Sequence, residues 1–244
     1  MRGRTGAAAA LLLALGGGPS PARAYEAVLV RDGGSLHGVV VFRGTAPAPA
    51  LSKITRDEAV CGKQAGDQSL RVGKGGGLAD VAVYLADIES GRAIDLAHAQ
   101  KLDNVHCQFE PHLQTLSVGQ TLVIRNSDPI LHNTHASVLE GAGNIFNIAL
   151  PTQGKEIRKV VAKPGVQQVK CDAGHTWMNA YFLVFEHPYH TVTDADGHFA
   201  LQDIPAGSYT LRAWHERLGT VDAKVQVAGA RDVEVQALVM QMQK

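Results

Sequence analysis

A cysteine, a histidine and a methionine stand close together late in the sequence, in the run Cys171-Asp-Ala-Gly-His175-Thr-Trp-Met178. Their side chains offer a thiolate, an imidazole and a thioether, directly before an apolar stretch. Thiolate and thioether are soft ligands and imidazole is borderline, so the set favours copper over magnesium, calcium or manganese. A loop this short turns three side chains toward one point, but a fourth ligand must come from elsewhere in the fold.

The fourth ligand is expected from the run Asn126-Ser-Asp-Pro-Ile-Leu-His132-Asn-Thr-His135. This run follows an apolar strand at residues 121–125, and the turn at Asp128-Pro129 places His132 at the start of the next segment. Two imidazoles, one thiolate and a weak axial thioether form a set that suits one-electron copper chemistry. His135 is the alternative to His132 if the loop has another register, or it lines the site.

Each of these residues also has an ordinary structural explanation. A single Cys171 is more often a small buried hydrophobe, a single His132 is more often hydrogen-bonded at a surface, and Met178 beside a tryptophan is compatible with a core. Their joint occurrence in this order, after this strand pattern, favours a metal site.

The elements that must position these ligands are predicted to be strands. Glycine is abundant, with 26 residues, and aromatic residues make up only 5% of the chain, so short apolar runs are separated by turns. Alternating apolar runs bounded by Gly, Pro and Asp-Gly pairs are typical of strands and hairpins. Strands are expected at 36–43, 80–88, 112–118, 120–125, 157–162, 167–170, 180–186, 198–201, 208–214, 221–227 and 233–240. The expected fold class is all-β, a sandwich joined to a small antiparallel sandwich.

The run from Phe109 to Asn126 carries Phe-x-Pro, a glycine turn, a strand and a closing Asn, and it resembles the first half of a cupredoxin. His132-Asn133 resembles the His-Asn pair of that family, and Cys171, His175 and Met178 fall on its Cys-His-Met loop. The resemblance covers roughly residues 79–186. It implies a Greek-key β-sandwich, one copper ion held by these four residues, and hydrogen bonds from Asn133 that hold neighbouring loops together. Three residues separate Cys from His and two separate His from Met, a spacing that differs from those of plastocyanin and azurin.

The C-terminal part, residues 187–244, resembles a carboxypeptidase regulatory-like domain of the transthyretin type. It carries Thr-Asp-x-x-Gly-x-Phe, a Pro-x-Gly turn and Tyr-x-Leu between Thr191 and Trp214. Such a resemblance implies a fold and says almost nothing about activity. The part is short for a complete sandwich, so the strand at 36–43 either completes it, with the copper domain as an insertion, or extends the copper domain. The strand at 80–88 fits either domain and is expected to be the first strand of the copper domain.

The first 24 residues are predicted to be a signal peptide. Arg2 and Arg4 precede an apolar run from Ala7 to Leu15 that is too short to span a bilayer, and Ala22-Arg23-Ala24 fits a cleavage site. The alternative is an uncleaved anchor helix, although Gly16 to Pro21 interrupts the apolar run. No later stretch is predicted to cross a membrane. The mature chain is expected to begin at Tyr25 and to be periplasmic or secreted in a bacterium.

The chain has three cysteines, so an exported form leaves one thiol that is reactive, pairs between chains or binds metal. Assignment of Cys171 to the metal leaves Cys61 and Cys107 as a disulfide pair, which suits an exported protein. This bond would attach the mostly irregular stretch 51–78, part of an N-terminal segment at 25–78, to the edge of the copper domain.

Three functions are compatible with these observations. The first is a carrier that passes single electrons to a partner protein outside the cytoplasm, with a dry shell of Trp177, Tyr181 and Phe146 around the metal. The second is an envelope binding or scaffolding module whose metal is structural. The third is copper handling, against which the scarcity of other methionines argues.

Two classes of function are not expected. The 23 basic and 23 acidic residues balance, so charge indicates neither nucleic acid nor an anionic membrane as a partner. An enzyme is not expected either, because the sequence lacks the common catalytic motifs, and a closed four-ligand copper site leaves no position for a substrate.

Overall fold

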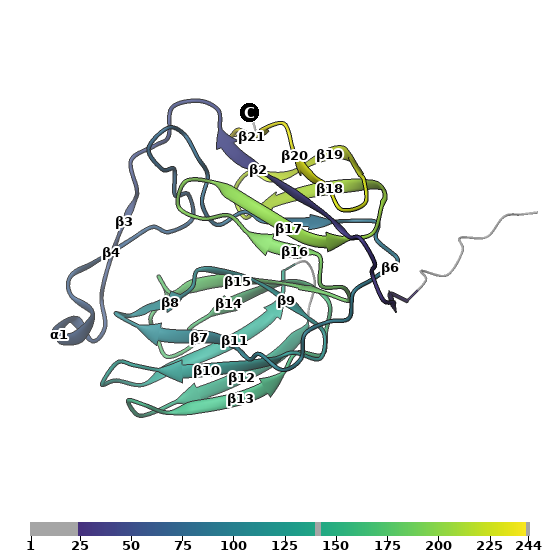
Figure 1. Cartoon of the computed structure of the whole chain (residues 1–244). Helices are drawn as coiled ribbons and strands as arrows, with labels where there is room; N and C mark the ends of the chain where they lie inside the picture. The colour runs from purple at the N-terminus through teal and green to yellow at the C-terminus, as the bar shows by residue number, and fades with distance from the viewer. Residues whose placement is uncertain (1–23, 140–142, 243–244) are drawn as a thin grey trace, which may run out of the picture.

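The computed structural model describes residues 24–139 and 143–242, and these residues are almost entirely strands, turns and loops. Most strands belong to two sandwiches that lie one above the other, and a hairpin with one short helix lies beside them (Figure 1). The all-β fold class is therefore confirmed. The predicted signal peptide falls, apart from Ala24, outside the described residues.

The first sandwich consists of two sheets with strand orders β13-β10-β7-β8 and β12-β11-β14-β15-β9. Apolar side chains from both sheets meet in one buried core, which includes Leu102, Phe109, Ile124, Val169 and Phe182. The strands are β7 (Gln100–Val105), β8 (Gln108–Glu110), β9 (Leu113–Ser117), β10 (Thr121–Asn126), β11 (His132–Val138), β12 (Asn144–Leu150), β13 (Glu156–Val160), β14 (Gly165–Lys170) and β15 (Asn179–Phe185).

The second sandwich consists of sheets with strand orders β16-β5-β18-β19 and β17-β2-β20, and β21 also pairs with β2. Leu36, Val83, Phe199 and Leu211 are among the residues of its separate core. The strands are β2 (Gly34–Phe42), β5 (Ala82–Leu85), β16 (His190–Val192), β17 (His198–Ile204), β18 (Gly207–His215), β19 (Gly219–Val227), β20 (Asp232–Glu234) and β21 (Leu238–Met240).

Strands from the N-terminal part complete the second sandwich. β2 pairs with β17, β20 and β21, and β5 pairs with β16 and β18. The expectation that the strand at 80–88 begins the copper domain is wrong, and the boundary at residue 79 is wrong with it. Alternation of apolar residues shows that a strand is buried, whereas the sheet that it joins depends on packing with distant segments.

The two sandwiches pack through a small apolar cluster and through polar pairs. β15 directs Phe182 into the core of the first sandwich and Tyr181 toward the second, because neighbouring side chains point to opposite faces. Tyr181 meets Trp214 of β18, with ring centroids 5.7 Å apart. His112 and Glu216 form a hydrogen-bonded pair across the same interface. Tyr181 therefore belongs to this interface and not to the expected shell around the metal.

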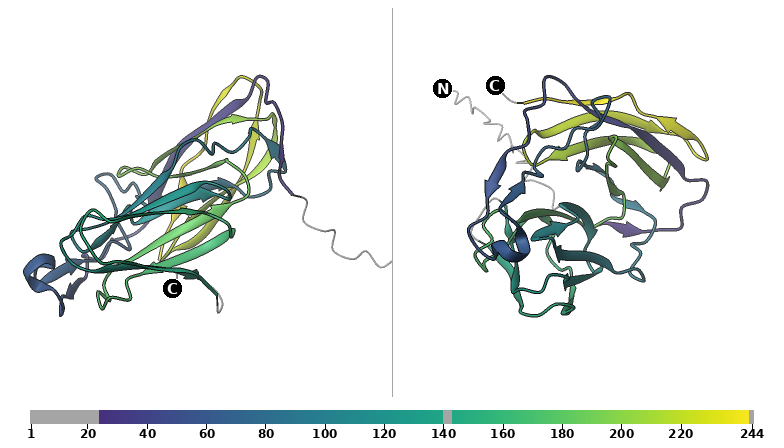
Figure 2. Two further views of the ribbon diagram at one scale, coloured as in Figure 1. Left: turned by 90° about the horizontal axis from the view of Figure 1, so that it is seen from below. Right: turned by 90° about the vertical axis from the view of Figure 1, so that its left-hand side faces the viewer.

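The remaining elements lie at the edges. Two short parallel strands, β1 (Glu26–Ala27) and β6 (Ser90–Gly91), pair near the start of the described chain. The hairpin of β3 (Leu51–Lys53) and β4 (Gln64–Gly66) has the helix α1 (Glu58–Cys61) at its tip. Figure 2 shows this hairpin from below and from the side, where it reaches the end of the first sandwich. Within residues 24–139 and 143–242 there is no helix with the length and apolar character that a bilayer crossing needs.

Candidate metal centre

Three elements of one sheet position the predicted ligands. β11 begins at His132, Cys171 directly follows β14, and Met178 directly precedes β15. β11 and β14 are antiparallel neighbours, with His135 opposite Lys170, so His132 and Cys171 come to the same end of the sheet. The loop then turns through Gly174, whose φ of +95° is a left-handed conformation that favours glycine, and brings His175 back to Cys171.

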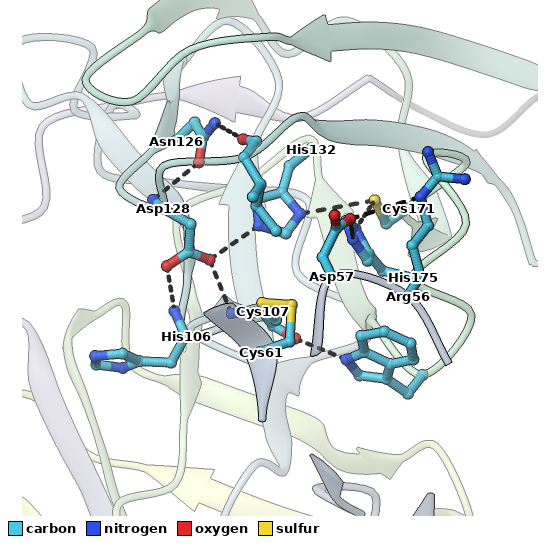
Figure 3. The surroundings of a disulfide bond; sticks show 12 residues. Arg56, Asp57, Cys61, His106, Cys107, Asn126, Asp128, His132, Cys171 and His175 are labelled. Carbon is cyan, nitrogen blue, oxygen red and sulfur yellow. Dashed lines mark hydrogen bonds and ion pairs between the residues drawn. A yellow bond between two sulfur atoms is a disulfide. The ribbon is translucent and has the colours of Figure 1, made fainter. Parts of the chain in front are cut away.

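His132, Cys171 and His175 form a compact group at this end (Figure 3). Sγ of Cys171 lies 3.5 Å from Nδ1 of His175 and 3.9 Å from Nδ1 of His132. The two imidazole rings lie 4.7 Å apart between centroids. Both histidines are 0% exposed and Cys171 is 5% exposed, so the group is shielded from solvent.

A carboxylate is hydrogen-bonded to each imidazole on the side away from the sulfur. Nε2 of His132 lies 2.9 Å from Oδ2 of Asp128, and Nε2 of His175 lies 2.8 Å from Oδ2 of Asp57. An ionised carboxylate only accepts hydrogen bonds, so each Nε2 carries the proton and each Nδ1 presents a lone pair toward Cys171. This arrangement, with a carboxylate on one ring nitrogen and a free lone pair on the other, is the one that metal-binding histidines use.

The spacing of the donor atoms fits a transition metal. Bonds of about 2.0 Å to nitrogen and about 2.3 Å to sulfur, as zinc makes them, hold the two atoms roughly 3.5–3.7 Å apart at angles between tetrahedral and trigonal. The separation of 3.5 Å to His175 lies at the lower end of that range, and the separation of 3.9 Å to His132 lies slightly above it. Two imidazoles and one sulfur are also the donor types that copper and zinc prefer.

In the absence of metal, burial shifts the pKa values of His132 and Cys171. It lowers the pKa of His132, an effect that the hydrogen bond to Asp128 partly offsets. It raises the pKa of the Cys171 thiol, while backbone N–H groups of Asn133, Ala173 and His175 act in the opposite direction. The imidazole of His132 is thus neutral and able to bind metal, and a metal must displace the thiol proton of Cys171.

Asn133 and Trp177 surround the group in different ways. The backbone N–H of Asn133 donates to Sγ of Cys171 at 3.4 Å, and the side-chain oxygen of Asn133 accepts from the N–H of Asp172 at 3.3 Å. The ring of Trp177 lies 5.3 Å from that of His175, and its Nε1–H donates to the carbonyl of Cys107 at 3.0 Å. Asn133 thus links the two ligand loops, and Trp177 links the metal loop to the disulfide.

The other predicted residues take three positions. Met178 is 1% exposed in the same core as Cys171, and its N–H donates to the carbonyl of His175 at 3.0 Å. His135 lies three residues after His132 in β11 and so on the other face of the strand, where its side chain is 29% exposed and is hydrogen-bonded to Asp172 at 2.7 Å. His135 therefore lies outside the group of potential ligands. Phe146 packs against the edge of the core and lies beside Lys159.

The predicted disulfide between Cys61 and Cys107 is confirmed, with the two Cα atoms 5.4 Å apart. Cys107 also lies near Asp128 and His132, in a second arrangement of potential ligands. Its sulfur is bonded to that of Cys61, which excludes it as a thiolate ligand in this oxidised state.

Sequence reasoning missed both carboxylates. Asp128 stood in the turn four residues before His132, a spacing that brings a turn carboxylate within reach of the ring. Its oxygens also accept the N–H groups of His106 and Cys107. Asp57 offered no comparable signal, because 118 positions separate it from His175 and only folding brings them together.

A scan against protein-family models and a search of curated proteins found no match to this chain. Similar solved structures include a reduced mutant of amicyanin, with 18% identity over 38% of this chain and 85% of that chain, at a TM-score of 0.32. A purple cupredoxin from Nitrosopumilus maritimus has 23% identity over 35% of this chain and 98% of that chain, at a TM-score of 0.30. The copper-containing nitrite reductase from Thermus scotoductus has 21% identity over 43% of this chain and 25% of that chain, at a TM-score of 0.31. At these scores the likeness is partial, and the residues of the site have to support a function by themselves.

Proposed function

We propose that this protein is an exported mononuclear copper protein that carries single electrons, with His132, Cys171, His175 and Met178 as its ligands. The observation that supports this proposal is the buried group of two imidazoles and one thiol. Each imidazole is held by a carboxylate, and its Nδ1 lies within 4 Å of the sulfur. Copper bound there would supply a reversible one-electron couple.

The protein orients the proposed ligands and excludes water from the site. Asp128 and Asp57 fix the two rings, and the N–H of Asn133 points to the sulfur. Ligands held in place before the metal changes its oxidation state leave little structure to rearrange during electron transfer. The core of the first sandwich lies behind the sulfur and excludes water from that side. These features favour a carrier over a site that must open to a substrate.

The decisive experiment is a titration of purified protein with Cu(II), followed by absorption and electron spin resonance. An intense visible band from a thiolate–copper bond is expected at one equivalent, and Cys171→Ser should abolish it. His132→Ala and His175→Ala should each remove or strongly shift the band. His135→Asn is the matched control, a histidine of the same strand outside the group, and should leave the band in place.

Two other outcomes would change the function. One colourless metal ion held tightly by the same residues would favour the scaffolding or copper-handling alternatives. No binding above the level of Cys171→Ser would overturn the copper proposal. Reversible reduction of the coloured protein at one electron per copper would separate a carrier from a copper store.

The proposed function also includes export from the cytoplasm and a redox partner protein. The protein recovered from the periplasm or the medium is expected to begin at Tyr25. A redox protein of the same compartment is the expected partner, and exchange of electrons with candidate proteins can be followed through the visible band.

A further inference from the structure

Residues 54–62, here called the cap segment, cover His175 from outside the sandwich. The segment forms the tip of the β3–β4 hairpin, and Cys61 in its last turn is bonded to Cys107 of the first sandwich. Its Asp57 meets Nε2 of His175, and its Arg56 lies against the turn at Gly174. Figure 3 shows Arg56 and Asp57 beside His175 and Cys171.

The cap segment is attached by few contacts. None of the four residues of α1 is fully buried, and Ile54 is the only side chain of the segment in the buried class. A segment with so little buried apolar surface opens locally at low cost. Its position over the site therefore depends on the disulfide and on the contact between Asp57 and His175.

Asp57 has an unusual role for a residue at the start of a helix. Aspartate at this position ordinarily caps the first turn with its side chain. Here the side chain makes no capping bond, and the residue takes a left-handed conformation with φ of +55°. The carboxylate is instead directed to His175.

We propose that the cap segment, tethered by Cys61–Cys107, closes the metal centre against solvent and that Asp57 is a positioning residue that sets the tautomer of His175. This inference rests on the proposed function for its purpose, since the protected thiol and imidazole are the proposed metal ligands. Molecules that reach Cys171, including a metal complex that delivers copper, must wait until the segment moves away.

The first test uses metal-free protein and the reaction of its thiol with iodoacetamide. The chain has three cysteines and two are bonded, so Cys171 is the one thiol that reacts. The double variant Cys61→Ala with Cys107→Ala also has this single thiol, which makes the rates directly comparable. We expect the double variant and Asp57→Ala to react about tenfold faster or more than wild type. Glu58→Gln, an exposed neighbour in α1, is the control and should react at the wild-type rate.

Loss of the disulfide also destabilises the whole fold, so the rates are measured at several low urea concentrations. Local opening of the cap segment exposes little surface, and its rate rises only weakly with urea, whereas global unfolding rises steeply. Asp57→Ala keeps the disulfide and provides a second variant if the double variant does not fold. Equal rates in wild type, Asp57→Ala and the double variant would overturn the closing role, and so would a steep urea dependence throughout.

The second test addresses positioning through the nitrogen NMR signals of His175 at one fixed pH. Wild type should show a single tautomer with the proton on Nε2. Asp57→Asn keeps an oxygen acceptor and should preserve that tautomer, whereas Asp57→Ala should give a mixture. An unchanged tautomer in Asp57→Ala would overturn the positioning role. Both tests omit copper, so they can fail or succeed separately from the copper titration.

Discussion

Oδ2 of Asp128 accepts a hydrogen bond from Nε2 of His132 at 2.9 Å, and both side chains are buried. The same carboxylate accepts the backbone N–H groups of His106 and Cys107 at 2.9 and 2.8 Å. One turn carboxylate therefore joins a proposed ligand to the hairpin that carries the disulfide.

Asp128→Ala should destabilise the protein strongly because it leaves three donors without an acceptor, and two of them, the N–H of Cys107 and Nε2 of His132, are buried. We expect a loss of about 3–5 kcal/mol in the free energy of unfolding, measured in urea. Asp222→Ala removes an exposed carboxylate that pairs with Arg212 and should cost about 1 kcal/mol or less. Equal losses for the two variants would show that the hydrogen bonds of Asp128 stabilise the fold no more than an exposed ion pair does.

Met178→Leu should preserve the fold and alter the metal. The swap conserves volume in the core, so the free energy of unfolding should fall by less than about 1.5 kcal/mol. The reduction potential of the copper form should rise, because a more apolar pocket without the thioether disfavours the more highly charged Cu(II). Met240→Leu makes the same change in the core of the second sandwich and should leave the potential unchanged. A potential that Met178→Leu does not move would exclude Met178 as a ligand.

Stability should decrease as the pH falls from about 6.5 toward 4. Burial lowers the pKa of His187 and His215 to about 4 and that of His190 to about 3. The unfolded chain, with histidines near 6.5, binds more protons than the folded chain throughout this window, so acid favours unfolding. Each histidine contributes up to roughly 1.4 kcal/mol per pH unit.

His215→Asn tests this pH effect at one position. An amide oxygen can replace Nδ1 of His215, which accepts the N–H of Arg217 at 3.1 Å, without taking up a proton. The slope of unfolding free energy against pH near 5 should fall by about the contribution of one proton. Val160→Ala, at an exposed position without a titratable group, should keep the wild-type slope. An unaltered slope in His215→Asn would mean that this residue is charged in the folded protein.

Trp214→Ala should weaken the junction of the two sandwiches. It removes the ring that meets Tyr181 and leaves a gap beside Leu183, so we expect a loss of about 2–4 kcal/mol. Calorimetry should show one transition in wild type and a broadened or divided transition in the variant. Val160→Ala, at an exposed position, should do neither. A single sharp transition in Trp214→Ala would show that the other interface contacts suffice.

The sequence alone determined what is local. Short alternating apolar runs predicted the all-β class. The odd number of cysteines, with Cys171 assigned to the metal loop, predicted the disulfide. The thiolate, imidazole and thioether of one short loop, and a histidine after a strand and a turn, predicted the ligands. Three of these predicted ligands, His132, Cys171 and His175, are the ones that the structure brings together. These features depend on residue type and near spacing, which folding preserves.

Only the tertiary structure decided what depends on distant packing. The alternation that made 80–88 a strand did not reveal that β5 would join the second sandwich, since a strand buried on both faces fits either sheet. The start of β11 at His132 put His135 on the other face, and that start depends on pairing with β12 and β14. Asp57 reaches His175 from a remote hairpin that the disulfide ties to the first sandwich. Contacts between segments more than a hundred residues apart leave no local pattern, so they are settled by the free energy of the whole fold.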